Sequence, residues 1–227
     1  MHILKFEVEN KDGIYSVLTK KYNVIDYLYP IDVYKRGKFY FILGLHLLDG
    51  EASEKDKFCR ALKKTKEVIK FEKYEDHVIT LIKEQELFYD QIYNPELFHP
   101  SPAIIQKGIE KWTVGSWDRE NLSKVLSSLE KEKKKFSNLR LDKFGKLKLD
   151  EIYFPKLLPK MSSQQKIAFQ LALANGYYGY PRKKDLKDLA KIMGVSISTY
   201  QEHLRRAEEK LMPLLGNSLK TSIGKND

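Results

Sequence analysis

The sequence has a single cysteine, Cys59, among its 227 residues. One thiol excludes an internal disulfide framework and a thiolate metal cluster. Cys59 stands in KFCRALKK, where Phe58 and Leu62 share the apolar face of an expected helix. We interpret it as a buried structural thiol. The alternative, a redox sensor, requires a thiolate that is exposed to solvent.

Long apolar runs are missing as well. No stretch approaches the roughly 20 residues that a membrane-spanning helix needs. Residues 1–9 lack the charged-then-apolar layout of a signal peptide. We therefore expect a cytoplasmic protein with no membrane partner.

Signatures of catalysis are absent from the sequence. It has no G-x-G-x-x-G after a strand, no G-x-x-x-x-G-K-[ST], no G-x-S-x-G and no H-E-x-x-H. We therefore expect no catalytic residues, no cofactor and no metal site; the alternative is a metal ligand at His99, in a proline-rich loop. The five histidines are scattered along the chain: His2, His46, His77, His99 and His203.

Positive charge, by contrast, is in surplus and unevenly spread. The chain has 41 Lys and Arg against 31 Asp and Glu, a formal net charge of +10. Residues 155–220 hold twelve Lys and Arg against five Asp and Glu, a net charge of +7. Such a surplus attracts polyanions. The carboxy-terminal third is therefore where we expect an anionic partner.

The first 74 residues alternate in the manner of a small α+β unit. Strand patterns at 2–8, 24–48 and 67–74 are separated by helical patterns at 12–22 and 53–66, and the turn at 35–38 divides the middle pattern into two strands. The order β-α-β-β-α-β is that of a ferredoxin-like unit.

Residues 77–145 repeat this plan. We expect a strand at 77–84, a helix at 85–93, a proline-rich loop at 94–102, a strand at 109–117, a helix from Asp118, and a last strand at 138–144 or 146–154. Two such units make a module over residues 1–151 for regulation or dimerisation. Its strand aromatics belong either to the core or to a ligand cleft. They are Tyr27, Tyr29, Tyr34, Tyr40, Trp112 and Trp117.

A change of hydrophobic period marks the next boundary. Residues 152–161 contain two prolines and read as a linker. Ser162 and Gln165 then fit a capping box, and Gly176 fits a left-handed helix stop. We expect a helix-turn-helix domain over residues 162–216 and a flexible tail over residues 217–227.

The helix-turn-helix expectation rests on four features in a row: a small residue, a glycine, the apolar Val195 and a cap. Asp185 caps a short helix whose stripe includes the small Ala190, which allows a close helix crossing. Gly194 suits a sharp bend with positive φ, and Ser196 caps the next helix. The apolar spacing of that helix, residues 196–211, turns Tyr200 and others inward. This layout is typical of DNA-reading hairpins.

Side chains that lie off this apolar stripe suit base edges and phosphates, because Gln pairs with adenine, Arg with guanine or phosphate, and Ser and Thr with either. The alternative is a surface helical hairpin whose charges are only solvated. The expected DNA contacts are Arg182, Lys183, Lys184, Ser196, Ser198, Thr199, Gln201, Glu202, Arg205 and Arg206.

The segment from Leu158 to about Leu215 resembles the helix-turn-helix domain of archaeal regulators typified by the bacterio-opsin activator. The resemblance is carried by QLALANGYY, YPRK, DLAKIMGVS and STYQEHLRRAEEKL. It implies a DNA-binding transcription regulator. Tyr200 departs from the Val or Leu that many such motifs have. The stretch IEKWTVGSWDRENLSKVLSSLEK also looks like the amino-terminal module of the same regulators.

We therefore predict an α+β protein, with an amino-terminal module of two ferredoxin-like βαββαβ units and a carboxy-terminal three-helix DNA reader. We expect it to regulate transcription by binding double-stranded DNA as a homodimer, with a small-molecule effector and the basal transcription machinery as further partners. Two alternatives remain. One is an RNA-binding or adaptor protein in which the hairpin is structural, and the other is a ligand-processing enzyme.

Overall fold

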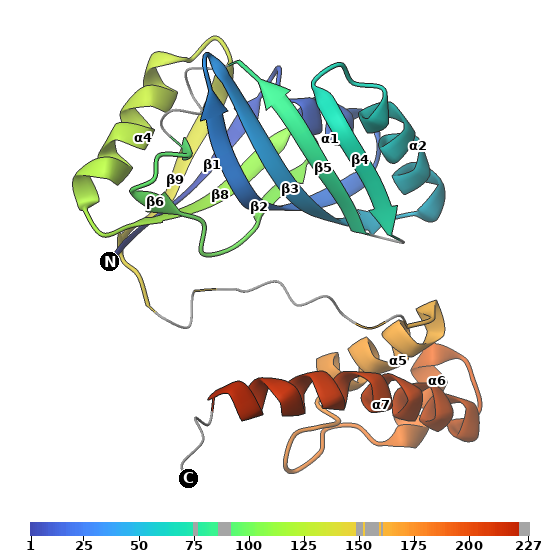
Figure 1. The fold of residues 1–227 in the computed structure, drawn as a ribbon. Helices are drawn as coiled ribbons and strands as arrows, with labels where there is room; N and C mark the ends of the chain where they lie inside the picture. Colours follow the sequence, from blue (N-terminus) through green and yellow to red (C-terminus); the bar gives the residue numbers. More distant parts are fainter. Residues whose placement is uncertain (75–76, 86–91, 149–151, 153–158, 160, 223–227) are drawn as a thin grey trace. The chain divides into compact units, whose positions relative to one another are not determined.

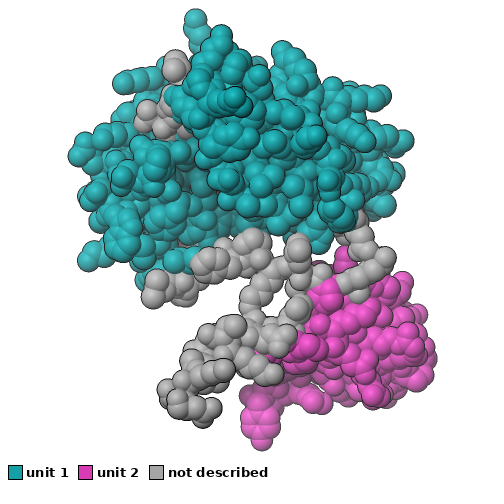
Figure 2. Space-filling model, viewed as in Figure 1, with its two compact units in different colours: residues 1–155 teal, residues 156–227 magenta. Residues whose placement is uncertain are grey.

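The structure is a computed structural model that describes residues 1–74, 77–85, 92–148, 152, 159 and 161–222. The chain divides into two compact units, Met1–Pro155 and Lys156–Asp227 (Figure 2). Among the described helices, none is long and apolar enough to cross a membrane. Most of the linker expected at 152–161 falls outside the described residues.

The first unit is an antiparallel sheet with helices (Figure 1). Its alternating stretches form strands because every second side chain enters the core. Its helices are α1 (Ile14–Lys21), α2 (Ala52–Lys63) and α4 (Arg119–Lys131). Its strands are β1 (His2–Asn10), β2 (Val24–Arg36), β3 (Phe39–Gly50), β4 (Val68–Tyr74), β5 (His77–Glu84), β6 (Leu97–Phe98), β7 (Ala103–Gln106), β8 (Ile109–Ser116) and β9 (Phe136–Lys146).

The strand order is β4-β5-β3-β2-β7-β8-β1-β9, with β6 paired to β8. The element order agrees with the predicted β-α-β-β-α-β pattern, but the pairing differs. In a ferredoxin-like unit the first strand lies between the third and fourth. Here β1 lies between β8 and β9, and β5 lies between β3 and β4. The first strand of each half therefore pairs with strands of the other half.

The last strand of the unit is β9, which begins at Phe136, so the first of the two expected ranges is the closer one. The short strand β7 was not predicted, because Pro100 and Pro102 directly before it read as loop. Most of the helix expected at 85–93 lies outside the described residues.

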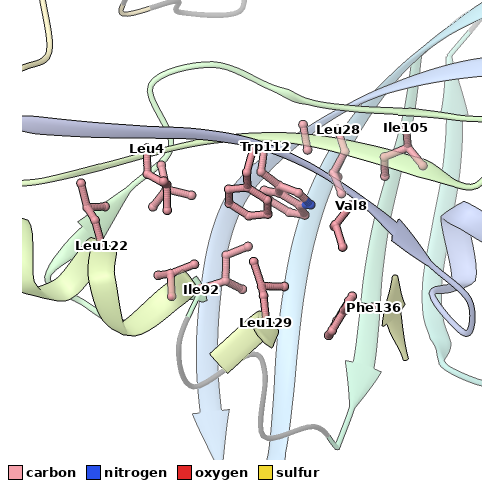
Figure 3. Close-up of a cluster of buried hydrophobic side chains, with 13 residues drawn as sticks. Leu4, Val8, Leu28, Ile92, Ile105, Trp112, Leu122, Leu129 and Phe136 are labelled. Atoms are coloured by element: carbon pink, nitrogen blue, oxygen red, sulfur yellow. The ribbon is translucent and has the colours of Figure 1, made fainter. Parts of the chain in front are cut away.

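The largest apolar core of the first unit lies between α4 and strands from both halves of the sheet. Leu4 and Val8 of β1 meet Leu28 of β2 and Trp112 of β8 there, and Leu122 contributes from α4 (Figure 3). A second cluster packs α2 on the sheet and includes Phe58 and Leu62. Cys59 belongs to that cluster and is buried, as predicted. Burial raises the pKa of its thiol, which keeps it in the unreactive form.

A buried polar chain links three central strands to α1. His46 Nδ1 lies 2.9 Å from an Asp26 carboxylate oxygen, and His46 Nε2 lies 3.0 Å from Thr80 Oγ1. The Tyr15 hydroxyl lies 3.1 Å from the same Thr80 oxygen. All four side chains find partners within the core, as buried polar groups require. His46 therefore has a structural role.

The aromatic residues considered for a ligand cleft do not gather in one place. Tyr40 and Trp112 are buried in different core clusters. Tyr34 stacks on Phe41 at 5.0 Å between ring centres, and Trp117 is 71% exposed. Tyr27 and Tyr29 are half-buried on β2. The core interpretation holds for two of the six.

His99 packs between two aromatic rings, with ring centres 5.5 Å from Tyr93 and 5.6 Å from Trp112. Burial lowers its pKa to about 4, and its Nδ1 is buried without a hydrogen-bond partner. Among the described residues, no group of three His, Cys, Asp or Glu side chains is arranged to hold a metal ion. The metal interpretation of His99 therefore gains no support.

Candidate nucleic-acid interface

The second unit contains three helices, α5 (Ser163–Ala174), α6 (Leu186–Met193) and α7 (Ile197–Ser222). Ser162 and Gln165 form the predicted capping box at the start of α5. Gly176, just after α5, has the expected positive φ of 69°. Helix α7 runs to Ser222 and contains Pro213, so the tail expected from residue 217 is partly helical.

A small apolar core holds the three helices together. Alanines at the crossings let the helix backbones approach closely, while larger residues fill the space between them. Its buried members are Ala168, Ala172, Leu189, Ala190, Tyr200 and Leu204.

Tyr200 is fully buried at the centre of this core. Its hydroxyl donates a hydrogen bond of 2.7 Å to the Ala168 carbonyl oxygen of α5. Burial raises the pKa of Tyr200 to about 12, so the phenol stays protonated and keeps donating. The tyrosine thus fills the centre of the three-helix core and also links α7 to α5.

The turn between α6 and α7 follows the predicted geometry. Asp185 caps α6 by accepting a 2.9 Å hydrogen bond from the amide of Asp188. Gly194 ends α6 with φ of 72°, which a glycine adopts without steric cost. The Val195 amide then bonds the Ala190 carbonyl at 3.0 Å. These contacts fix the direction in which α7 leaves the turn.

The amino-terminal turn of α7 carries a cluster of hydroxyl groups. Ser196 Oγ accepts a 3.1 Å hydrogen bond from the Thr199 amide and therefore caps the helix. The same oxygen lies 2.7 Å from Thr199 Oγ1 and 3.0 Å from Ser198 Oγ. The first turn contains no acidic residue, so the positive end of the helix dipole is left uncompensated there.

The outward face of α7 is polar and exposed, as the inward positions of Tyr200, Leu204 and Ala207 require. Two ion pairs run along it. Arg206 lies 2.6 Å from Glu202 and Arg205 lies 3.2 Å from Glu209, both at i, i+4 spacing. The exposed residues on this face include Ser198, Thr199, Gln201, Glu202, Arg205, Arg206 and Glu209.

The loop between α5 and α6 carries the basic triplet. The Arg182 guanidinium stacks over the Tyr177 ring at 4.6 Å, and the stem of Lys183 packs on Gly176, where an added Cβ would approach it to 3.0 Å. Tyr178 donates a 2.5 Å hydrogen bond to Glu208 of α7. The loop is thus braced on both sides, and Arg182, Lys183 and Lys184 remain exposed.

Several exposed residues beside these groups were not predicted as contacts from the sequence. Glu209 pairs with Arg205, which the i, i+4 spacing would have indicated. Lys187 and Lys191 are exposed on α6 at the same spacing. Tyr180 is fully exposed directly before the basic triplet. All ten predicted contact residues lie on the second unit and are exposed, on the loop before α6 and on the first turns of α7.

The second unit is similar in sequence to parts of known proteins. Residues 161–213 match the family described as "HTH DNA binding domain". A "Dimethyl sulfoxide reductase transcriptional activator" of Halobacterium salinarum is 42% identical over 52 residues, 23% of this chain and 23% of that protein. A "Bacterioopsin transcriptional activator" of the same organism is 38% identical over 52 residues, 23% of this chain and 8% of that protein.

The match thus spans less than a quarter of this chain and of either relative. It covers α5, α6 and the first part of α7, that is, the three-helix core and the exposed polar face of α7. The second unit therefore carries a helix-turn-helix DNA-binding domain.

Proposed function

We propose that this protein is a sequence-specific regulator of transcription that reads double-stranded DNA with the first turns of α7. The observation that carries the proposal is the exposed polar face of α7 on a packed three-helix scaffold, within a segment that matches a DNA-binding family. In helix-turn-helix proteins the amino-terminal turns of the second helix enter the major groove.

The proposed contacts divide into two kinds. Ser196, Ser198 and Thr199 stand at the positive end of α7, where hydroxyls and amides bind phosphate or base edges. Gln201 and Glu202 follow one turn later and suit adenine and cytosine edges. Arg182, Lys183 and Lys184 bind phosphates from the loop before α6, and their braced loop limits the entropy that binding would cost.

Arg205 and Arg206 act by partner exchange. In the free protein Arg205 is paired with Glu209 on the following turn of α7, and Arg206 with Glu202 on the preceding turn. On DNA each exchanges that exposed carboxylate for a phosphate or guanine. Exposed i, i+4 pairs contribute only about 0.3–0.5 kcal/mol, so a polyanion can displace them.

We further infer that the domain limits follow the sequence: a regulatory module at 1–151, a linker at 152–161, and the DNA reader at 162–216. The strand order of the first unit supports two ferredoxin-like halves that have exchanged their first strands. Such a module serves ligand sensing or dimerisation. Two copies are expected on DNA, because one short helix reads few bases.

The test is a gel-shift series with double-stranded DNA and single-stranded RNA over increasing salt. Arg205→Ala combined with Arg206→Ala is expected to weaken duplex binding by roughly 10- to 100-fold, since two phosphate or base contacts are lost. Its thermal midpoint should stay close to that of the wild type, because both side chains are exposed.

The matched control is Lys133→Ala combined with Lys134→Ala, which removes the same charge from exposed positions of the first unit. It should leave duplex binding nearly unchanged. Equal losses in both double variants would mean that net charge alone drives binding. Tighter binding of the single-stranded RNA than of any duplex would contradict the proposal in favour of an RNA-binding protein.

A further inference from the structure

The sheet of the first unit has two faces of different character. Alternate residues of its strands, such as Leu28 and Val78, enter the cores under α2 and α4. The neighbours of these residues along β2, β3 and β5 point to the opposite face. These three strands lie side by side in the sheet (Figure 1). Seven large side chains there are half-buried and form what we call the outer apolar face: Tyr27, Tyr29, Leu43, Leu45, Leu47, Ile79 and Leu81.

These seven residues are direct neighbours across the strands. Tyr27 is paired with Leu47, and Leu45 is paired with both Tyr29 and Ile79. Leu43 is paired with Leu81. The register therefore makes one continuous surface three strands wide, rather than scattered apolar residues.

The corresponding surface of the other half of the sheet has charged and polar residues at its centre, beside Ile3, Ile104 and Ile109. There β1 and β8 take the places that β5 and β3 have in the first half. On the same side of the sheet they carry Lys5 paired with Thr113, and Glu7 paired with Lys111. The ammonium group of Lys111 also forms an ion pair with Glu7. An apolar centre is thus not a requirement of this fold, because the second half carries charged and polar residues at the matching positions.

The size of the outer apolar face suits the centre of an interface. Strands about 4.8 Å apart, with same-face residues about 6.8 Å apart along each strand, give seven residues a patch of roughly 230 Å². A standard protein interface takes about 800 Å² from each partner, with an apolar centre and a polar rim. The rim here carries both signs of charge, with Lys70 and Glu72 on β4, Asp32 on β2 and Lys83 on β5.

We propose that two copies of this chain associate by packing their outer apolar faces against each other. The proposal rests on the proposed function, which calls for two DNA readers, and it names the surface that joins them. Two sheets packed face to face lie about 10 Å apart and interdigitate their side chains.

The chemistry of the outer apolar face favours a second copy of this chain over other binding partners. Its centre contains no charged side chain, so it offers no cation to the phosphates of a nucleic acid. A two-fold interface brings each rim residue close to the rim of the other copy, so a rim with both signs can complement itself. This matters for a chain of net charge +10, whose copies otherwise repel each other.

The first test is the molar mass of the full chain by light scattering after gel filtration. The wild type is expected at twice 26.6 kDa, and Leu45→Glu at 26.6 kDa, because a carboxylate at the centre cannot be buried unpaired. The matched control, Thr113→Glu, puts the same charge on the same side of the polar half and should stay dimeric. A monomeric wild type, or a dimeric Leu45→Glu variant that keeps its circular dichroism and melting temperature, would refute the proposal.

The second test does not depend on tolerance of a glutamate. Leu45→Cys adds one thiol to a chain whose own Cys59 is buried. Its reaction with a maleimide is expected to slow as protein concentration rises through the dimerisation range. Fast labelling at every concentration would mean an open face, and slow labelling at every concentration would mean that the same chain covers it. Either result would overturn the proposal.

Binding to duplex DNA separates this proposal from the proposed function. The Leu45→Glu monomer should still shift a single half-site with near wild-type affinity, while losing tight binding to paired half-sites. A wild type that is dimeric but binds no duplex would contradict the regulator and leave the interface standing. A wild type that is monomeric but binds duplex would contradict the proposed interface and leave the regulator standing.

Discussion

Tyr200 joins two functions in one side chain. Its ring fills the centre of the three-helix core, and its hydroxyl ties α7 to the Ala168 carbonyl of α5. The orientation of α7 toward any groove therefore depends on a residue that touches no solvent. This anchor therefore determines where the exposed residues of α7 are presented.

Tyr200→Phe removes only the hydroxyl. We expect the second unit to lose about 1 kcal/mol of unfolding free energy, the usual net contribution of one hydrogen bond. Urea unfolding followed by circular dichroism measures this loss. DNA affinity should change little if the ring alone holds α7 in place. A large fall in affinity with unchanged stability would instead assign the hydroxyl a part in orienting the helix.

The sequence predicted the inward and outward positions of α7 correctly, since Tyr200, Leu204 and Ala207 recur at helical spacing. It did not predict the hydrogen bond to Ala168. A hydrogen bond between residues 32 positions apart depends on how two helices cross, and no local pattern encodes that crossing.

At the scale of elements, α7 combines attraction and repulsion on one face. Arg205 and Arg206 attract phosphate, while Glu202 and Glu209 hold them by ion pairs and repel phosphate themselves. If α7 reads DNA as proposed, we expect such a face to bind any duplex weakly until base contacts compensate. The carboxylates thus favour discrimination over affinity.

Glu202→Gln tests this balance. The change keeps the size of the side chain, frees Arg206 and removes one negative charge. Affinity for unrelated duplex is expected to rise by roughly three- to tenfold, because one more cation becomes available to phosphate. Fluorescence anisotropy with labelled random duplex measures the effect.

The control for that experiment is Glu130→Gln on α4, an exposed residue of the first unit, which makes the same change of charge. It should leave the affinity for random duplex within error of the wild type. An equal rise in both variants would assign the effect to net charge rather than to the release of Arg206.

Element order was predictable from the sequence, but strand pairing was not. The alternation in HILKFEV predicts a strand with Leu4, Phe6 and Val8 on one face, and those residues are buried. The same pattern would suit a place beside β3 and β4 equally well. The partners of β1 are instead β8 and β9, 100 residues or more away, and such long-range pairing leaves no local signal.

At the scale of the whole molecule, the free energy of unfolding depends on pH through two titratable side chains of the first unit, His99 and Glu110. The pKa of His99 falls to about 4 by burial, below its ordinary value near 6.5. The unfolded chain therefore takes up a proton at a higher pH than the folded chain does. The contribution of His99 to the free energy of unfolding is fully present above pH 6.5 and is lost as the pH falls toward 4. Glu110 acts in the opposite sense, because burial raises its pKa and protonation relieves the cost of its buried charge.

We expect the wild type to lose about 2 kcal/mol through His99 between pH 7 and pH 5. The variant His99→Phe keeps an aromatic ring between Tyr93 and Trp112 but cannot titrate, so its urea midpoint should fall less over the same range. Parallel losses in the two proteins would show that other groups cause the pH dependence. His77→Phe, on β5, serves as a control for the removal of a histidine.

The exchange of first strands also affects the order in which the chain can fold during synthesis. When the ribosome has made the first 74 residues, β4 and β3 are present, but the strand that joins them is not. The opening strand likewise waits until residue 146 for its second neighbour. Neither half can complete its sheet as a nascent fragment, so the unit matures only when nearly all of it has left the exit tunnel. A chain truncated between the halves is consequently expected to be degraded or to aggregate rather than to persist as a folded half.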